Sequence, residues 1–306
     1  MPSTRKKRKV SDLTVDDANA LLRTLAEFQE QLDDEDEDLP TGLISGLEQL
    51  RKKLEVIPHT PFSKADALTL LQVKIKTAPL LLSLDVMSDI RNLGVSTRAP
   101  GRELSMDSLR ELIELVKRHV SLVTEAGCRI LINMILLRVV SAMSTDKMDV
   151  NIIPEFPIAK TTFSGSHSFG GVVDLLLTKL PSRYTRYLLL DPTSALGNPE
   201  AIDGPTTSNF FEAKRDNVRA AIPQAVIAVA SHCAQHGIPV LRGCTTSGEQ
   251  WIFFVYVTNQ NGGGRVACSD EFSLGEQLEG LPLILGLLTD WVDHATQYDQ
   301  KFFTCK

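Results

Sequence analysis

Two strongly apolar segments of the chain contain charged side chains. Asp174 lies in the run GGVVDLLL at residues 170–177, and a carboxylate buried there needs a metal ion, a cation or hydrogen bonds. Glu212 and Lys214 lie in the run NFFEAKR at residues 209–215, where their spacing puts both on one face of a strand. Two carboxylates can bind a hard divalent cation, and a lysine beside it can orient water or offset phosphate charge. This combination is suited to hydrolysing a phosphodiester.

The hydrophobic periodicity predicts the elements that must position these residues. Residues 120–143 form a helix that is apolar nearly all round and therefore buried, with Glu125 near its start. A mixed α/β pattern follows, with a loop at residues 191–208. The expected strands are residues 170–177, 187–190, 209–215, 238–241 and 250–257, and the expected helices are residues 218–236 and 281–298.

A resemblance to a known family depends on the order of these motifs. A helix with Glu125, the GGVVD run, the FFEAK run and a helix with Gln224 together resemble the PD-(D/E)XK nuclease superfamily. The similarity covers residues 120–258 and is closest in character to RecB-like members and fungal Crinkler-type nuclease-like domains. It implies a restriction-endonuclease-like α/β fold, a mixed sheet flanked by helices, whose core is a helix, three strands, a helix and a fourth strand.

The resemblance also implies roles for individual residues. A Mg²⁺ or Mn²⁺ ion would be bound by Asp174, Glu212 and the carbonyl of Ala213. The catalytic residues would be Lys214, Glu125 and Gln224. Two features depart from the family pattern: Val173 precedes the strand aspartate where the family name has proline, and 38 residues separate Asp174 from Glu212.

The resemblance leaves more than one function open. The first expectation is a metal-dependent nuclease that hydrolyses DNA or RNA. The alternative is a catalytically inactive nuclease-fold module, or a helical adaptor, that binds a protein or nucleic-acid partner. The candidate nucleic-acid contacts are Arg183, Arg186, Arg215 and Arg219. The first two alternate with Tyr184 and Tyr187, which suits phosphate contact and base stacking, although a solvated loop explains the pattern equally well.

Other chemistry receives less support. His232 and His236 have an i, i+4 spacing that can bind zinc, but no third ligand is evident in the sequence. The sequence contains no Walker A or GxGxxG motif. Its five cysteines are scattered and never form CxxC, which favours a reducing compartment. No window approaches about 18 consecutive apolar residues, so no membrane association is expected.

The N-terminal 40 residues contain opposed charge runs. The cluster Arg5, Lys6, Lys7, Arg8 and Lys9 suits the acidic groove of an import receptor and predicts a nuclear location. An amphipathic helix around residues 21–32 precedes six consecutive acids at residues 33–38, which repel one another and predict disorder. Five of the six net negative charges lie in this segment, so the remaining chain is nearly neutral and does not suit a chromatin-coating protein.

We therefore expect four regions. Residues 1–40 form a disordered tail, and residues 41–119 form an all-helical region available to a protein partner. Residues 120–258 form the nuclease-like core, and residues 259–306 form a C-terminal linker and helix.

Overall fold

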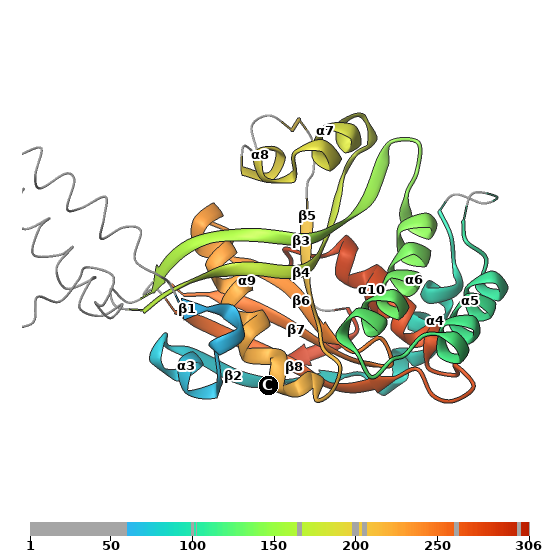
Figure 1. The fold of residues 1–306 in the computed structure, drawn as a ribbon, viewed down its shortest axis with the longest axis horizontal. Coiled ribbons are helices and arrows are strands. Elements are labelled where there is room, and N and C mark those ends of the chain that lie inside the picture. The colour runs from blue at the N-terminus through green and yellow to red at the C-terminus, as the bar shows by residue number, and fades with distance from the viewer. Residues whose placement is uncertain are drawn as a thin grey trace, which may run out of the picture.

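A mixed α/β sheet flanked by helices forms the body of the protein (Figure 1). The structure is a computed structural model that describes residues 60–98, 101, 103–163, 167–197, 202–203, 207–259, 263–298 and 301–305. Within these residues nine strands share one sheet. They are β1 (Thr60–Pro61), β2 (Ile75–Leu82), β3 (Met148–Phe163), β4 (His167–Pro181), β5 (Thr207–Ala213), β6 (Val240–Thr246), β7 (Gln250–Thr258), β8 (Gly264–Ser273) and β9 (Phe303–Cys305).

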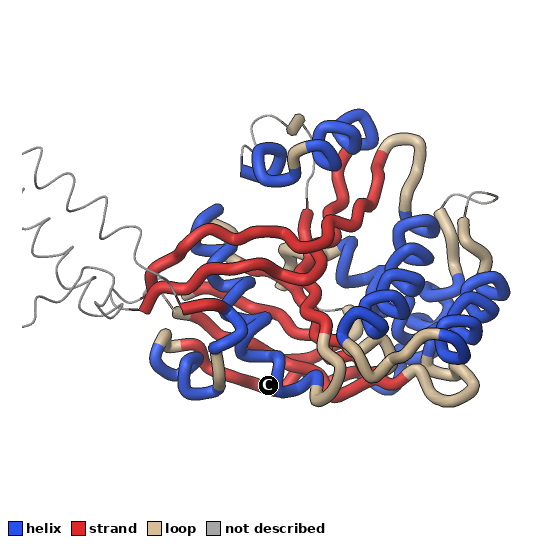
Figure 2. The backbone as a smooth tube through the Cα atoms, in the orientation of Figure 1, coloured by secondary structure: helices blue, strands red, loops and turns tan. Residues whose placement is uncertain are grey.

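The strands follow the order β1-β4-β5-β6-β7-β8-β2-β9, and β3 also pairs with β4. The pairs β3–β4, β4–β5, β6–β7 and β7–β8 are antiparallel, whereas β5–β6 and β2–β8 are parallel. The helices are α3 (Ala67–Gln72), α4 (Met87–Val95), α5 (Met106–His119), α6 (Glu125–Met143), α7 (Thr185–Leu190), α8 (Pro192–Gly197), α9 (Ile222–His236) and α10 (Leu281–Asp293). Figure 2 shows how helices and strands are distributed over the molecule.

Two hydrophobic cores form because neighbouring strand residues point to opposite faces of the sheet. Phe211 belongs to the core that includes residues of α4, α5, α6 and α10. Phe210, one residue earlier, belongs to the core that includes residues of α3 and α9. In Figure 1, α9 and α3 accordingly lie apart from the cluster of α4, α5, α6 and α10. The end of β5, where Glu212 lies, is therefore covered by helices on both faces.

Helix α6 is the central helix of the first core. Thr124 is its N-cap and accepts a hydrogen bond of 3.1 Å from the Gly127 N–H. Among the described residues it is the one helix long and apolar enough to cross a membrane. We interpret it as a core helix, because Leu131, Ile132 and Leu136 are fully buried in the first hydrophobic core, which also contains residues of the sheet. The absence of a membrane partner stays a prediction.

The structure confirms most predicted elements around the candidate site and corrects others. Helices α6 and α9 and strands β4, β5 and β7 match the predicted segments. The predicted strand at residues 187–190 is wrong, because these residues lie in α7. A four-residue apolar run does not distinguish strand from helix. The predicted loop at residues 191–208 contains α8 and the start of β5.

The sheet extends beyond residues 120–258 on both sides. The prediction that residues 41–119 are all helical is wrong at residues 75–82, which form β2 and pair with β8. Strand β8 lies in the segment expected to be a linker, and α10 ends at Asp293 rather than at residue 298. The predictions for residues 1–40, and those for residues 41–59, lie outside the described residues.

Candidate active site

Asp174 and Glu212 meet on adjacent strands. Strands β4 and β5 are antiparallel with Leu175 opposite Phe211, so continuing the register by one residue puts Asp174 opposite Glu212. The Ala213 N–H also donates a hydrogen bond of 2.8 Å to Oδ2 of Asp174. The predicted convergence of the two acids is therefore confirmed. The long connection between them passes through α7 and α8, which lie at the top of Figure 1.

Glu212 is the most deeply buried charged group of this cluster, with 3% of the residue exposed. Its Oε1 accepts hydrogen bonds from Nζ of Lys214, at 2.9 Å, and from Nε2 of Gln224 in the first turn of α9. Burial raises the pKa of Glu212 to about 8, and the neighbouring Asp174 charge adds to this effect while Lys214 opposes it. Both predicted partners, Lys214 and Gln224, therefore contact the same carboxylate oxygen.

Lys214 keeps its positive charge near neutral pH. Burial on its own lowers the pKa of this amine, but the charges of Glu212, Asp174 and Glu125 outweigh it and the net shift is upward. The backbone N–H of Lys214 also donates a hydrogen bond of 2.8 Å to the Thr246 carbonyl, which continues the β5–β6 pairing past the end of β5. The geometry therefore suits charge compensation by Lys214 better than proton abstraction.

Sequence reasoning missed a cation at this site, Arg129. Its guanidinium forms ion pairs with Asp174, with Glu125 at 2.9 Å and with Glu155 at 3.5 Å. These three acids come from β4, α6 and β3. Arg129 follows Glu125 by one helical turn, and this i, i+4 spacing is a signal that could have drawn attention to it. The contact with Asp174 has no signal in the sequence, because strand pairing creates it.

Glu155 was also not predicted. It lies between Pro154 and Phe156, which pair with Leu175 and Val173, so it is opposite Asp174 on the other side of β4. Its φ is +52°, a left-handed conformation that is uncommon for residues other than glycine. The side chain is 72% exposed, so it meets Arg129 at the surface.

The site fits a divalent cation in charge and donor chemistry. Four carboxylates, of Glu125, Glu155, Asp174 and Glu212, face the two cations Arg129 and Lys214, which leaves two negative charges when all are ionised. Mg²⁺ favours such oxygen donors and commonly uses one or two carboxylates together with water. Within the described residues no group of three or more His, Cys, Asp and Glu side chains forms a ready-made metal site.

Ala213 contacts the site through its backbone N–H. The residue is fully buried, and its N–H is the group that contacts Asp174. Coordination of a metal by its carbonyl stays a prediction.

A surface cavity of about 480 Å³ opens beside the site. Glu125, at the start of α6, and Lys214, just after β5, line it together with Val123, Thr124, Arg215 and Asp216. Glu125 is 45% exposed and reaches the acid pair through Arg129 rather than directly. Lys214 is therefore accessible from this cavity.

The four candidate nucleic-acid contacts do not form one surface. Arg215 is 57% exposed, pairs with Asp216 and lines the cavity beside Lys214. Arg219 is exposed and lines a different cavity with Cys268 and Asp270. Arg183 and Arg186 lie before and in α7, which leads to the start of β5. The start of β5, at Thr207, is five residues or roughly 17 Å away from Glu212 along the strand.

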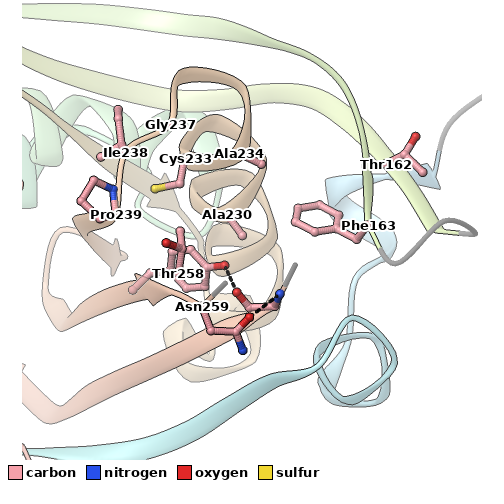
Figure 3. Close-up of a pocket in the computed structure, with 12 residues that line it drawn as sticks. Thr162, Phe163, Ala230, Cys233, Ala234, Gly237, Ile238, Pro239, Thr258 and Asn259 are labelled. Carbon is pink, nitrogen blue, oxygen red and sulfur yellow. Dashed lines mark hydrogen bonds between the residues drawn. The ribbon is translucent and has the colours of Figure 1, made fainter. Parts of the chain in front are cut away.

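A third cavity, shown in Figure 3, is chemically different. It has a volume of about 320 Å³ and lies at the C-terminal end of α9, where Cys233, Gly237 and Ile238 line it. Burial raises the pKa of the Cys233 thiol to about 12, so this cysteine is a poor nucleophile. The hydrogen bonds drawn there, from the Tyr256 hydroxyl to the Gly263 carbonyl and from the Gly263 N–H to Oδ1 of Asn259, only brace the wall.

The histidine pair does not form a metal site with other described residues. His232 packs against Phe156 and Phe210 in the second core, and its ring centroid lies 4.4 Å from that of His236. Burial lowers the pKa of His232 to about 3, so it is neutral and part of the hydrophobic core.

Comparisons with known proteins do not identify the site. The sequence matches neither a known family model nor a curated protein. Its interpretation therefore depends on the residues and geometry described above.

Proposed function

We propose that this protein is a metal-dependent phosphodiester hydrolase of the PD-(D/E)XK type, acting on DNA or RNA. The observation that carries the proposal is the contact of Asp174, Ala213, Glu212, Lys214 and Gln224 where the middle of β4 lies beside the end of β5 and the start of α9. An E-x-K sequence alone is common and often lies on a solvated strand face. Here Glu212 is buried, and both Lys214 and Gln224 donate hydrogen bonds to its Oε1, which a solvated strand face does not explain.

The order of the elements supports the same proposal. Helix α6 is followed by β3 and β4, then, after the inserted helices α7 and α8, by β5, α9 and β6. This agrees with the helix, three strands, helix and fourth strand that the resemblance implies. The first three strands are antiparallel and β6 is parallel to β5. The restriction-endonuclease-like assignment is part of the proposal.

The residues have separable roles in the proposed reaction. The oxygen of a water molecule bonds to phosphorus and loses one proton to the solvent, the bond to one ester oxygen breaks, and that oxygen takes up a proton from the solvent. A divalent cation bound by Asp174 and Glu212 would supply Lewis-acid polarisation of the phosphate. Lys214, held cationic by its acidic neighbours, offsets the charge that develops on the phosphate oxygens. Gln224 holds the Glu212 carboxylate in position.

A cleavage assay tests the proposal. The full chain is incubated with single-stranded and duplex DNA and RNA while Mg²⁺ or Mn²⁺ is titrated. Lys214→Ala should lower the rate by about 10²–10³-fold, the usual cost of removing a transition-state charge partner. Lys147→Ala is the matched control, because Lys147 is exposed in the turn between α6 and β3. Equal cleavage by wild type and Lys214→Ala would assign the activity to a contaminant and reject the proposal.

One observation favours a second candidate, a catalytically inactive nuclease-fold module. Arg129 already neutralises Asp174, and it does so with a guanidinium that also pairs with Glu125. An inactive module of this kind would bind nucleic acid or a protein without cutting it. Metal-independent binding of nucleic acid by wild type, without cleavage, would favour this candidate. Binding of a protein partner by residues 1–119 is the further alternative.

A further inference from the structure

Arg129 is the one side chain that links three of the four acids at the site. Its Nη2 contacts both Asp174 and Glu125, and its Nη1 contacts Glu155. Asp174 receives this guanidinium on Oδ1 and the Ala213 N–H on Oδ2. Both oxygens of the acid assigned to the metal are therefore engaged in hydrogen bonds. A metal ion that bound Oδ1 would lie beside the guanidinium, and the two positive charges would repel each other. The metal ion and Arg129 therefore compete for this oxygen.

From this geometry we infer that Arg129 is the internal counter-ion of the metal-free site and that a divalent cation displaces it from Asp174. The inference depends on the proposed function, because it concerns the same metal site. Without metal, Arg129 keeps the Asp174 carboxylate paired. Because it competes with the metal for this carboxylate, it would set the metal concentration at which the site fills.

The surroundings of Arg129 allow it to withdraw. Its side chain is 33% exposed, so it is only partly buried. Its Nε is buried and has no hydrogen-bond partner, so the group is held only through Nη1 and Nη2. Glu125 and Glu155 are 45% and 72% exposed and can keep the guanidinium after Asp174 is released. The displaced charge is then still paired, which lowers the cost of displacement.

The experiment measures Mn²⁺ binding rather than activity. The full chain is titrated with Mn²⁺ by calorimetry, and free Mn²⁺ is followed by electron paramagnetic resonance. We expect Arg129→Gln to bind Mn²⁺ at least about tenfold more tightly than wild type, the equivalent of one charge-assisted contact of roughly 1.4 kcal/mol. Arg129→Lys should lie between the two, because lysine keeps the charge without the bidentate fork. Asp174→Asn should lose the binding.

Arg215→Gln is the matched control for charge alone. Arg215 lines the cavity beside Lys214 and its ion pair is with Asp216, so its loss removes one positive charge near the site without freeing Asp174. It should tighten Mn²⁺ binding by less than about threefold, the size of a solvent-screened charge effect. A change as large as that of Arg129→Gln would overturn the inference, because it would reduce the effect to bulk electrostatics.

The outcomes separate the inference from the proposed function. If wild type binds Mn²⁺ and both Arg129 variants bind it equally or more weakly, the inference fails and the proposed function stands. If wild type does not bind but Arg129→Gln does, the inference is supported and the inactive module is favoured. If no variant binds, both fail. Circular dichroism checks folding, and should Arg129→Gln not fold, Arg129→Lys decides by the same comparison with wild type.

Discussion

Nζ of Lys214 lies 2.9 Å from Oε1 of Glu212, and the acid is buried while the amine is 26% exposed. The two are neighbours on one face of the chain, yet their surroundings differ. Burial and Asp174 favour the protonated acid, whereas three nearby acids favour the protonated amine. Burial and the Asp174 charge therefore raise the pKa of Glu212, and a divalent cation that bound this carboxylate would compete with its proton.

Stability of the metal-free protein should depend on pH through Glu212. The folded-state pKa of about 8 lies above the ordinary value of 4.5, so the folded state binds a proton that the unfolded state has lost. This contribution is complete below pH 4.5 and is lost as the pH rises through 8, with an upper limit of about 5 kcal/mol. Urea unfolding in EDTA between pH 5.5 and 9 measures it.

Glu212→Gln is the control for this titration, because the amide keeps the shape and cannot ionise. The difference in unfolding free energy between the variant and wild type should grow in favour of the variant as the pH rises. A difference that stays constant over this range would contradict the assignment of a raised pKa to Glu212.

Asp174→Ala should destabilise the metal-free protein. Relief of repulsion between carboxylates would by itself stabilise it, but the substitution also leaves the buried Ala213 N–H without its acceptor and removes one of the three acids paired with Arg129. An unsatisfied buried donor costs about 1–3 kcal/mol, so we expect a net loss of that order. Thermal and urea unfolding in EDTA measure it. A Tm above that of wild type would mean that carboxylate repulsion dominates.

The fully buried ion pair of Arg242 and Asp290 should be far more important to stability than exposed pairs. Nη1 of Arg242 lies 2.8 Å from Oδ2 of Asp290, and the guanidinium also stacks on Trp291. Asp290→Ala should cost about 3–5 kcal/mol, because it leaves a buried charge uncompensated. Replacing both residues, as Arg242→Met with Asp290→Leu, should cost less.

Urea unfolding compares these variants with Asp203→Ala, whose partner is Arg183. Arg183 is 60% and Asp203 92% exposed, so the loss of this solvent-screened pair should leave stability nearly unchanged. A loss for Asp290→Ala no larger than for Asp203→Ala would show that the buried pair has little net effect on stability.

The basic cluster predicts nuclear import independently of the fold. Residues 1–12 fused to a fluorescent carrier too large to diffuse through nuclear pores should accumulate in the nucleus, because five adjacent cations suit an acidic receptor groove. The matched fusion with Lys6, Lys7 and Lys9 changed to alanine should not accumulate. Equal fluorescence of the two fusions in the cytoplasm would reject the prediction.

The sequence determined the parts of the site that depend on neighbours along the chain. Alternation on a strand is enough to put Glu212 and Lys214 on one face, and a charged residue inside an apolar run marks Asp174 as buried and in need of a partner. The long apolar helix before them was equally evident, because its pattern persists over five turns. These inferences use only local geometry, which a sequence specifies directly.

Only the tertiary structure decided which groups from distant segments meet. Arg129 and Asp174 are 45 residues apart, and their ion pair exists because α6 packs against β3 and β5, the strands on either side of β4. Glu155 is opposite Asp174 through the register of β3, a strand whose two prolines, Pro154 and Pro157, obscure its pattern. Strand β2 was missed for a similar reason, since Pro79 interrupts a run whose pairing with β8 stabilises it. Strand pairing is a long-range property, and its partner is not encoded by local periodicity.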